Sequence, residues 1–287
     1  MSSRTYYDPL HQSISLNSEI KEEAMVMELI DSIPFQRLRR IKQLGPAYLT
    51  FHGAESSRFT HSLGVFHIAR RALNRLIKIR PDFKQYKAIL YAKALLHDLG
   101  HGPLSHTCEE IFGIKHENWT ARLIKEHPQI NSTLNKIHPE NSNTISDFFE
   151  FKKSPQKLIS SLISSQLDCD RLDYLMRDSY STGTRYGQID LERILSAITI
   201  APDGDLAIHP KGVMAVEHYL VIRNLMYKTV YNHRLNEVCN WLLSKIIKTV
   251  CDSLPFFIDC IETTIFLTSP LNSLFIICDM NGFLIIK

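Results

Sequence analysis

Residues 95–106 read LLHDLGHGPLSH and place an adjacent histidine and aspartate, His97 and Asp98, at the end of an apolar run. Two more histidines, His101 and His106, follow within nine residues. An imidazole nitrogen and a carboxylate oxygen suit a first-row divalent metal ion. An isolated His-Asp pair is more often a capping aspartate beside a buried histidine. The rest of the chain must therefore decide what this stretch does.

The surrounding pattern predicts a mainly α-helical protein. Residues 85–97 are apolar nearly all round and indicate a buried central helix that ends near Gly100. Residues 62–79 are amphipathic, and His61 lies at their start. Antiparallel packing of these two helices would bring His61 beside His97 and Asp98. Further helices are expected from about 18 to 44 with a break at Pro34, and at about 116–127, 144–151, 155–178 and 213–250, with short strand pairs at 5–16 and 197–209.

The bulk composition is that of an ordinary globular protein. The chain has 287 residues, 44% of them hydrophobic and 22% charged, which suits one large domain or two small ones. A net charge of +3 does not by itself indicate a nucleic-acid binder. Six scattered cysteines without a CxxC pair fit reduced thiols, and no signal-peptide or 18-residue apolar run is present. We expect a soluble, cytoplasmic protein.

The segment 251–287 differs from residues 1–250. It is rich in Phe, Ile, Leu and Cys, and neither Lys nor Arg occurs in it before the final residue. One interpretation is a pair of hydrophobic strands or a buried helix. The other is an atypical tail, at which the natural domain is truncated or altered.

Four residues form a candidate metal site. His61, His97 and Asp98 would meet at the helix ends. Asp170 lies within the predicted helix 155–178, and because positions 170, 174 and 178 are four residues apart, Asp170, Tyr174 and Asp178 share one face of it. Two histidines and two aspartates leave coordination positions open, which is typical of a catalytic rather than a structural metal site.

Four blocks of this sequence resemble a known family. They are FQRLRRIKQLG at 35–45, RFTHSLGV at 58–65, HDLGHGPLSH at 97–106 and DRLDYLMRD at 170–178. The chain resembles the HD-domain metal-dependent phosphohydrolases, with their H…HD…D signature. It is most similar to the deoxynucleoside triphosphate triphosphohydrolases, which include the vertebrate sterile-alpha-motif and HD-domain protein and bacterial relatives. The resemblance implies an HD-domain helical fold with small β-hairpins over residues 1–250.

The resemblance also implies a metal cofactor and a reaction. His61, His97, Asp98 and Asp170 would hold a divalent metal ion (Fe, Zn, Mn or Mg). A metal-activated water would attack the α-phosphorus of a dNTP and release a deoxynucleoside and inorganic triphosphate. The matching histidines around the α-phosphate are His101, His106 and His116. One of them would protonate the departing 5′ oxygen, and which one stays open.

A set of substrate-binding residues follows from the same resemblance. The phosphate contacts would be Arg58, Arg171 and Arg223, the sugar-side contacts Tyr174, Asp178, Tyr227 and Tyr231, and the base-edge contact Gln43. Arg171 stands where the vertebrate member has lysine, and Tyr227 stands where it has histidine, so sugar and base selectivity stay open. Without the resemblance, the stripe of 223, 227 and 231 on one helix face would indicate ordinary core packing.

Three further residues match a guanine-reading effector site of the vertebrate enzyme. They are Asp31, Gln36 and Arg39. Asp and Arg on one segment can read a guanine edge, but they serve equally well as a helix cap and a surface ion pair. Activation by a guanine nucleotide is one hypothesis for this segment.

The function expected first is dNTP hydrolysis by a homo-oligomer that does not enter a membrane. One alternative keeps the metal site and changes the substrate to a monophosphate, a cyclic nucleotide or an alarmone. Another is a nucleotide-sensing or nucleic-acid-binding scaffold with little turnover. The small net charge counts against nucleic acid, because binding by counterion release calls for a denser basic patch.

Overall fold

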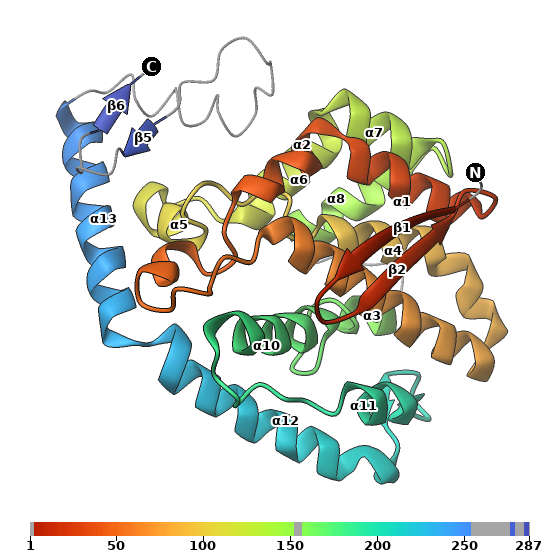
Figure 1. The fold of residues 1–287 in the computed structure, drawn as a ribbon. Helices are drawn as coiled ribbons and strands as arrows, with labels where there is room; N and C mark the ends of the chain where they lie inside the picture. Colours follow the sequence, from red (N-terminus) through yellow and green to blue (C-terminus); the bar gives the residue numbers. More distant parts are fainter. Residues whose placement is uncertain (1–2, 152–156, 254–275, 279–283, 287) are drawn as a thin grey trace.

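Helices dominate the fold (Figure 1). The computed structural model describes residues 3–151, 157–253, 276–278 and 284–286, and the mainly α prediction is confirmed for them. The α-helices are α1 (Lys21–Asp31), α2 (Ile33–Arg37), α3 (Arg58–Ile79), α4 (Lys87–Leu96), α5 (His106–Phe112), α6 (His116–Glu126), α7 (Pro128–Asn135), α8 (Asn141–Phe151), α9 (Lys157–Ser161), α10 (Cys169–Thr182), α11 (Leu191–Ala197), α12 (Val213–Met226) and α13 (Arg234–Ser253). The 3₁₀ segments are η1 (Leu38–Arg40), η2 (Gly45–Leu49), η3 (Pro81–Tyr86) and η4 (Pro210–Gly212), and η5 (Tyr227–Tyr231) is a π-helical turn. None of the helices in this part of the chain has both the length and the hydropathy that a bilayer crossing requires.

The strands form small antiparallel hairpins. β1 (Ser3–Asp8) pairs with β2 (Gln12–Asn17), and β3 (Ile198–Ile200) pairs with β4 (Leu206–Ile208), which confirms both predicted strand pairs. β5 (Ile276–Cys278) pairs with β6 (Leu284–Ile286) in the segment for which strands were one interpretation. The rest of the prediction for 251–287 falls on 254–275, 279–283 and 287, which lie outside the described residues.

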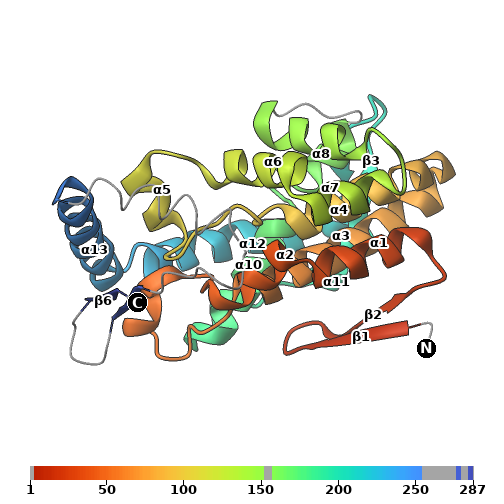
Figure 2. The same ribbon diagram turned by 90° about the horizontal axis from the view of Figure 1, so that it is seen from above.

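The centre of the fold is α3, which packs against both α4 and α10. Ser57 caps α3 by accepting a hydrogen bond from the Thr60 backbone N–H at 3.3 Å, so the helix starts one turn before the predicted position and includes His61. Its inner face is fully buried, with Phe66 and Leu73 at 0% exposure. α6 and α8 lie on one side of α3 and α4, and the β1–β2 hairpin lies on the other (Figure 2). The start of α3, the end of α4 and the start of α10 therefore meet.

Two segments that were each predicted as one continuous helix are divided in the structure. The segment 213–250 is not one helix, because α12 widens into the π-helical turn η5 and the chain turns before α13, which runs in a different direction (Figure 1). The Asn236 side chain donates to the Val230 carbonyl at 2.9 Å and fixes this turn. The segment 155–178 is also broken, because Asp168 caps a new helix by accepting from the Arg171 N–H at 2.8 Å.

Three short helices were not predicted. They are α5, α7 and α11, each of seven or eight residues. A helix of two turns presents too few positions for a clear apolar stripe. The omission matters at α5, which carries a residue of the candidate site.

Candidate metal centre

His61, His97 and Asp170 converge on one point. The two Nε2 atoms of His61 and His97 are 3.2 Å apart, and Asp170 Oδ1 lies 3.0 Å from His61 Nε2 and 3.7 Å from His97 Nε2. The Asp98 carboxylate closes the group, with Oδ2 at 3.6 Å from His61 Nε2 and Oδ1 at 3.5 Å from His97 Nε2. The four predicted metal ligands are therefore brought together from α3, the end of α4 and the start of α10.

The hydrogen bonds on the far side of each ring fix where the lone pairs point. His97 Nδ1 lies 2.9 Å from the Ala94 carbonyl oxygen, which can only accept, so Nδ1 carries the hydrogen. His61 Nδ1 lies 2.8 Å from an Asp173 carboxylate oxygen in the same arrangement. Both Nε2 atoms thus face each other and two carboxylates, an arrangement that a proton on one ring or a metal ion at the centre would satisfy. Donors held about 2.1 Å from a metal ion lie about 3.0 to 3.4 Å apart, which is close to the 3.0 to 3.7 Å that separate these atoms.

The pKa values of His61 and Asp170 also indicate a positive charge at this site. Burial would lower the pKa of His61, but hydrogen bonds to Asp170 and Asp173 outweigh it and raise the pKa to about 10. For Asp170, burial favours the protonated acid, yet hydrogen bonds to His61 and His97 hold its pKa well below the usual range. The site therefore holds a positive charge, either a proton on His61 or a metal ion that displaces it.

Asp173 is a buried hub that the sequence analysis missed. Besides His61, its carboxylate contacts His11 Nε2 at 2.6 Å and accepts from Arg177 Nε at 2.8 Å. Arg177 in turn donates to Asp8 at 2.9 Å. Through this hub the β1–β2 hairpin, which supplies Asp8, connects with the metal centre. A hint in the sequence was that Asp173 lies one helical turn after Asp170.

The close approach of α3 and α10 depends on Gly64. A Cβ on this residue would lie 1.9 Å from an Asp173 carboxylate oxygen, so only glycine leaves room for the hub. Gly64 belongs to the predicted block RFTHSLGV, three residues after His61. The block thus supplies both a ligand and the space for the residue that orients it.

Arg58, a predicted phosphate contact, is buried beside the metal ligands. It donates to the Asp98 carboxylate and to the Ser105 hydroxyl, and it is 4% exposed. Burial raises the pKa of Asp98, but the Arg58 guanidinium more than offsets this and keeps it well below the usual range. In this structure Arg58 therefore stabilises the ionised form of Asp98.

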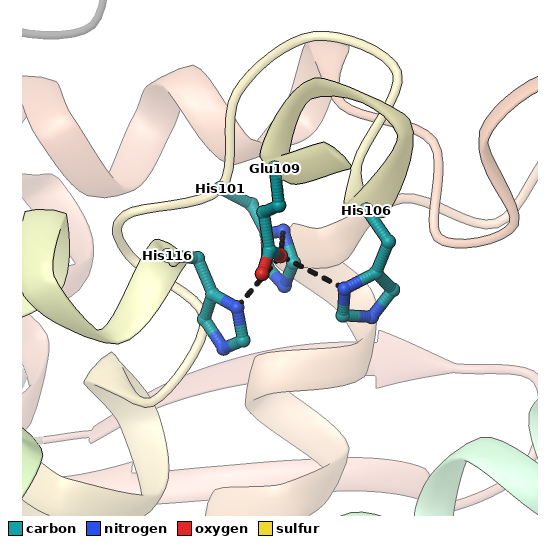
Figure 3. A group of neighbouring side chains, drawn as sticks. All are labelled: His101, His106, Glu109 and His116. Carbon is teal, nitrogen blue, oxygen red and sulfur yellow. Dashed lines mark hydrogen bonds and ion pairs between the residues drawn. The ribbon is translucent and has the colours of Figure 1, made fainter. Parts of the chain in front are cut away.

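The three predicted catalytic histidines gather around a glutamate that was not predicted (Figure 3). Glu109 of α5 accepts hydrogen bonds from Nδ1 of His106 and Nδ1 of His116, both at 2.8 Å. The His101 and His116 rings stack at 3.9 Å between centroids. Glu109 follows His106 by one helical turn, a spacing that could have pointed to it.

The predicted sugar-side residues contact one another between α10 and η5, where Asp178 is buried. Tyr231 donates to the Asp178 carboxylate at 2.9 Å, and its ring meets the Tyr174 and Tyr227 rings at 5.8 and 5.0 Å between centroids. The Arg223 guanidinium lies 5.8 Å from the Tyr227 ring centre.

The predicted cations divide into two groups. Arg223 of α12 donates to the Gln166 side chain at 2.9 Å, and Arg171 of α10 donates to Asp168, so both are held by side chains of the turn before α10. Arg58 is apart from them at Asp98. Gln43 lies near Arg58, which donates to its backbone carbonyl at 3.4 Å, and its own side-chain oxygen is buried without a hydrogen bond among the described residues.

The raised pKa of the Asp178 carboxyl group implies that the stability of the protein depends on pH. Burial raises its pKa from an ordinary 3.8 to about 7, although the hydrogen bond from Tyr231 lowers it. Between these values the folded state binds more protons than the unfolded chain, so the free energy of unfolding falls as pH rises towards 7. We expect Asp178→Asn to remove this loss and to improve the melting temperature, relative to the parent protein, more at pH 8 than at pH 5. Calorimetry at both values checks this, and an equal change at the two would contradict it; the exposed turn variant Asp203→Asn is the control.

The three predicted effector residues lie on α1, α2 and η1. Arg39 Nε donates to Gln36 Oε1 at 2.7 Å and stacks 3.6 Å over the Phe59 ring. Asp31 is instead engaged by Arg4 of β1, with N···O distances of 2.7 and 2.8 Å. The structure therefore joins Gln36 to Arg39 and leaves Asp31 in a separate ion pair.

Two protein-family models match the parts of the chain that carry these residues. The HD-domain family model matches residues 58–178, and a model described as an HD associated region matches residues 189–257. The first match contains the four converging ligands and Asp173. The second contains Arg223, Tyr227 and Tyr231.

Individual relatives agree with the family models. An uncharacterized protein of Bacillus subtilis is 42% identical over 85% of this chain and 55% of its own length. The Dictyostelium discoideum homolog of the deoxynucleoside triphosphate triphosphohydrolase SAMHD1 is 29% identical over 76% of this chain and 45% of its own. A phosphohydrolase from Bacteroides thetaiotaomicron has a similar fold, with a TM-score of 0.76 and 31% identity over 87% of this chain and 59% of that one. The chain spans about half the length of the curated relatives it matches. The chain carries an HD domain, and it resembles the HD-domain phosphohydrolases and, among them, the deoxynucleoside triphosphate triphosphohydrolases.

Proposed function

We propose that this protein hydrolyses deoxynucleoside triphosphates to the deoxynucleoside and inorganic triphosphate, with a divalent metal ion as cofactor. The observation that carries the metal requirement is the meeting of two imidazole lone pairs and two carboxylates at 3.0 to 3.7 Å. Support for a deoxynucleoside triphosphate as the substrate comes from the group of Tyr174, Tyr227 and Tyr231. Arg171 and Arg223 lie on the same helices as these tyrosines or on the helix that leads to them. The similarity to a triphosphohydrolase adds to this support.

Separate groups of residues would bind the metal ion, neutralise the triphosphate, contact the sugar and donate a proton. His61, His97, Asp98 and Asp170 would hold the ion, which when bound polarises a phosphate oxygen and lowers the pKa of a water. Arg171 and Arg223 would neutralise the triphosphate. A deoxyribose would lie against the ring of Tyr231, which Asp178 fixes through a hydrogen bond and which would exclude a 2′-hydroxyl. The leaving 5′ oxygen needs a proton, and His101, His106 and His116 are the candidate donors.

The test is product analysis on the full chain. Protein loaded in turn with Mn²⁺, Mg²⁺, Fe²⁺ or Zn²⁺ is incubated with the four dNTPs and the four NTPs, and the products are separated by anion-exchange chromatography. We expect inorganic triphosphate and the deoxynucleoside, with the NTPs cleaved more slowly. Monophosphate or pyrophosphate as the product would overturn the proposal, as would unchanged turnover in the His97→Ala/Asp98→Ala variant.

The same assay tests the effector hypothesis. We propose that a guanine nucleotide binds at Gln36 and Arg39 and competes with Arg4 for Asp31. Added GTP is then expected to raise dNTP turnover in the parent protein and to have less effect in Arg39→Ala. No response to GTP in the parent protein would remove this part of the proposal without affecting the reaction.

We further propose that the protein acts as a homo-oligomer. Apolar side chains lie exposed on α12 and α13, including Met214 at 76% and Trp241 at 60%. Exposed apolar patches of this kind mark interaction sites. Light scattering on the purified chain is expected to give a mass above the 33.1 kDa of one copy.

A further inference from the structure

One side chain of the β1–β2 turn lies in the buried interface between α3 and α10. His11 Nε2 is 2.6 Å from Asp173 Oδ1, and the two side chains are 3% and 0% accessible. The other oxygen of the same carboxylate, Oδ2, is 2.8 Å from Nδ1 of His61. One carboxylate of α10 thus joins a residue of the first hairpin to a ligand of the proposed metal centre.

The direction of these hydrogen bonds follows from the charge of Asp173. Burial would raise the pKa of its carboxyl group, but the Arg177 guanidinium and the hydrogen bonds from His11 and His61 keep it well below the usual range. An ionised carboxylate can only accept hydrogen bonds. His11 therefore donates from Nε2, and His61 donates from Nδ1, which leaves Nε2 of His61 for a metal ion.

Contacts on both oxygens set the orientation of the Asp173 carboxylate. Oδ2 accepts from His61 and from Arg177 Nε, each at 2.8 Å. Oδ1 accepts from Arg177 Nη2 at 3.1 Å and from His11 at 2.6 Å. Arg177 lies four residues after Asp173 on α10, so it moves with this helix. His11 supplies the shorter contact to Oδ1, and it fixes the carboxylate against a different part of the fold.

Other contacts hold His11 in this position. The carboxylate of Asp8 accepts from the backbone N–H groups of Leu10 and His11 at 2.9 and 3.0 Å, which fixes the turn. Its second oxygen accepts from Arg177 at 2.9 Å and joins the turn to α10. The His11 ring contacts the His67 ring of α3, with 5.3 Å between the ring centres. His11 therefore donates from a backbone and a ring that are both held in place.

The direction of a metal-bound imidazole depends on the group that its second nitrogen contacts. A ring held at Nδ1 keeps Nε2 pointing at one place, whereas a ring without a fixed partner rotates about its Cβ–Cγ bond. Nε2 of His61 lies 3.2 Å from Nε2 of His97. A tilt of the Asp173 carboxylate would change this separation, so a residue that prevents the tilt acts on the metal centre without touching the ion.

We propose that His11 is a positioning residue of the metal centre. By donating to Oδ1 it fixes the Asp173 carboxylate, and through this carboxylate it fixes the direction in which His61 presents Nε2 to the ion. The inference rests on the proposed function, in which His61 is a metal ligand. It adds that the β1–β2 hairpin is required for metal affinity, although none of the four proposed ligands belongs to it.

A matched pair of variants of the full chain tests the donor of His11. Glutamine keeps a side-chain N–H at about the reach of Nε2, and methionine has nearly the same length and volume without a donor. Metal-stripped protein is titrated with Mn²⁺, and the free ion is measured by electron paramagnetic resonance. We expect His11→Met to bind Mn²⁺ about 10-fold more weakly than the parent protein and His11→Gln to stay within about threefold of it, because partners of metal-bound histidines contribute on this scale. His11→Phe, which keeps a ring but lacks the donor, should behave as His11→Met.

Ile14→Val controls for looser packing of the hairpin. Ile14 lies on β2, is 0% exposed and has no polar group that could contact Asp173. This variant should lower the melting temperature and leave the Mn²⁺ affinity unchanged. Circular dichroism of the metal-free proteins shows that each variant folds.

The proton on Nδ1 of His61 gives a second readout. Nuclear magnetic resonance detects it in the Zn²⁺-loaded protein with isotope-labelled histidine rings. We expect this proton to exchange with solvent faster in His11→Met than in the parent protein, and at the parent rate in His11→Gln and Ile14→Val. A contact that only stabilised the hairpin would not separate the two His11 variants in this way.

Failure of this inference is distinct from failure of the proposed function. The inference alone is overturned if His11→Met binds Mn²⁺ as tightly as the parent protein, or if His11→Met and His11→Gln lose affinity equally. Both fail if the parent protein binds no Mn²⁺, or if His61→Ala/Asp170→Asn binds it as tightly as the parent. A protein that shows the expected affinities and cleaves no dNTP would overturn only the proposed reaction.

Discussion

Asp170→Asn is expected to lose the proposed metal ion of the metal centre, which is formed by His61, His97, Asp98 and Asp170, and to hydrolyse substrate at least about a thousand-fold more slowly. A bound metal contributes several kcal/mol to the transition state, and each 1.36 kcal/mol is about tenfold in rate. The carboxylate oxygen of Asp170 lies 3.0 Å from His61 Nε2 and is the donor that comes from α10. An amide at this position removes a negative charge where two imidazoles need one. Metal content per chain and the turnover number are the two measurements.

The control for Asp170→Asn is Asp203→Asn in the β3–β4 turn. Asp203 accepts a hydrogen bond from the Asp205 N–H at 3.0 Å, a contact that asparagine can also make. This variant should keep both metal and turnover. Full turnover in Asp170→Asn at normal metal content would show that the residue is not a ligand. The side chain of Asp170 is 30% exposed, so unfolding is not the expected cause of the loss.

Asp173→Asn is expected to weaken metal affinity at the metal centre by about 10- to 100-fold, the usual effect of removing the partner of a metal-bound histidine. It is also expected to lower the free energy of unfolding by about 3 to 5 kcal/mol, because it leaves the buried Arg177 charge poorly compensated. Asp173 and Arg177 are 0% and 2% exposed. Chelator competition measures the affinity, and urea unfolding of the metal-free protein measures the stability.

Asp8→Asn separates the two effects of the hub. Asp8 also pairs with Arg177, at 2.9 Å, but none of its hydrogen bonds goes to His61. It should therefore share part of the stability loss and keep the metal affinity. An equal loss of affinity in both variants would mean that the hub acts by general destabilisation rather than by orienting His61.

The meeting of His61 with His97 and Asp98 could be predicted from the sequence because these residues lie at the ends of two helices with a clear pattern, whereas Asp170 was predicted inside a longer helix, 155–178, that the structure divides. His61 opens an amphipathic helix and His97 closes an apolar one, so antiparallel packing was enough to bring them together. The roles of the predicted site residues beyond this geometry, including the substrate contacts, stay predictions. The sugar-side residues nevertheless contact one another between α10 and η5.

The missed features share a physical origin, which is that they depend on tertiary contacts. Tyr227–Tyr231 contains neither proline nor glycine, so nothing local predicts a π-helical turn; Tyr231 reaches Asp178 from it. Asp173 is one of several aspartates in its helix, and only the approach of α3 at Gly64 makes it a hub. Glu109 lies in a helix of seven residues whose partners, His101 and His116, come from outside it.

The link between the first hairpin and α10 has a consequence for biosynthesis. His11 and Asp173 are 162 residues apart in the chain, and His61 and Asp170 are 109 apart. At about 5 to 20 residues per second on the ribosome, about 10 to 30 s pass between the synthesis of His11 and that of its partner. Closing loops of this length costs entropy that local helix formation does not repay, so these contacts form late. The metal centre is therefore expected to be loaded only after α10 has left the ribosome, and a nascent chain arrested before residue 170 should retain none of its metal.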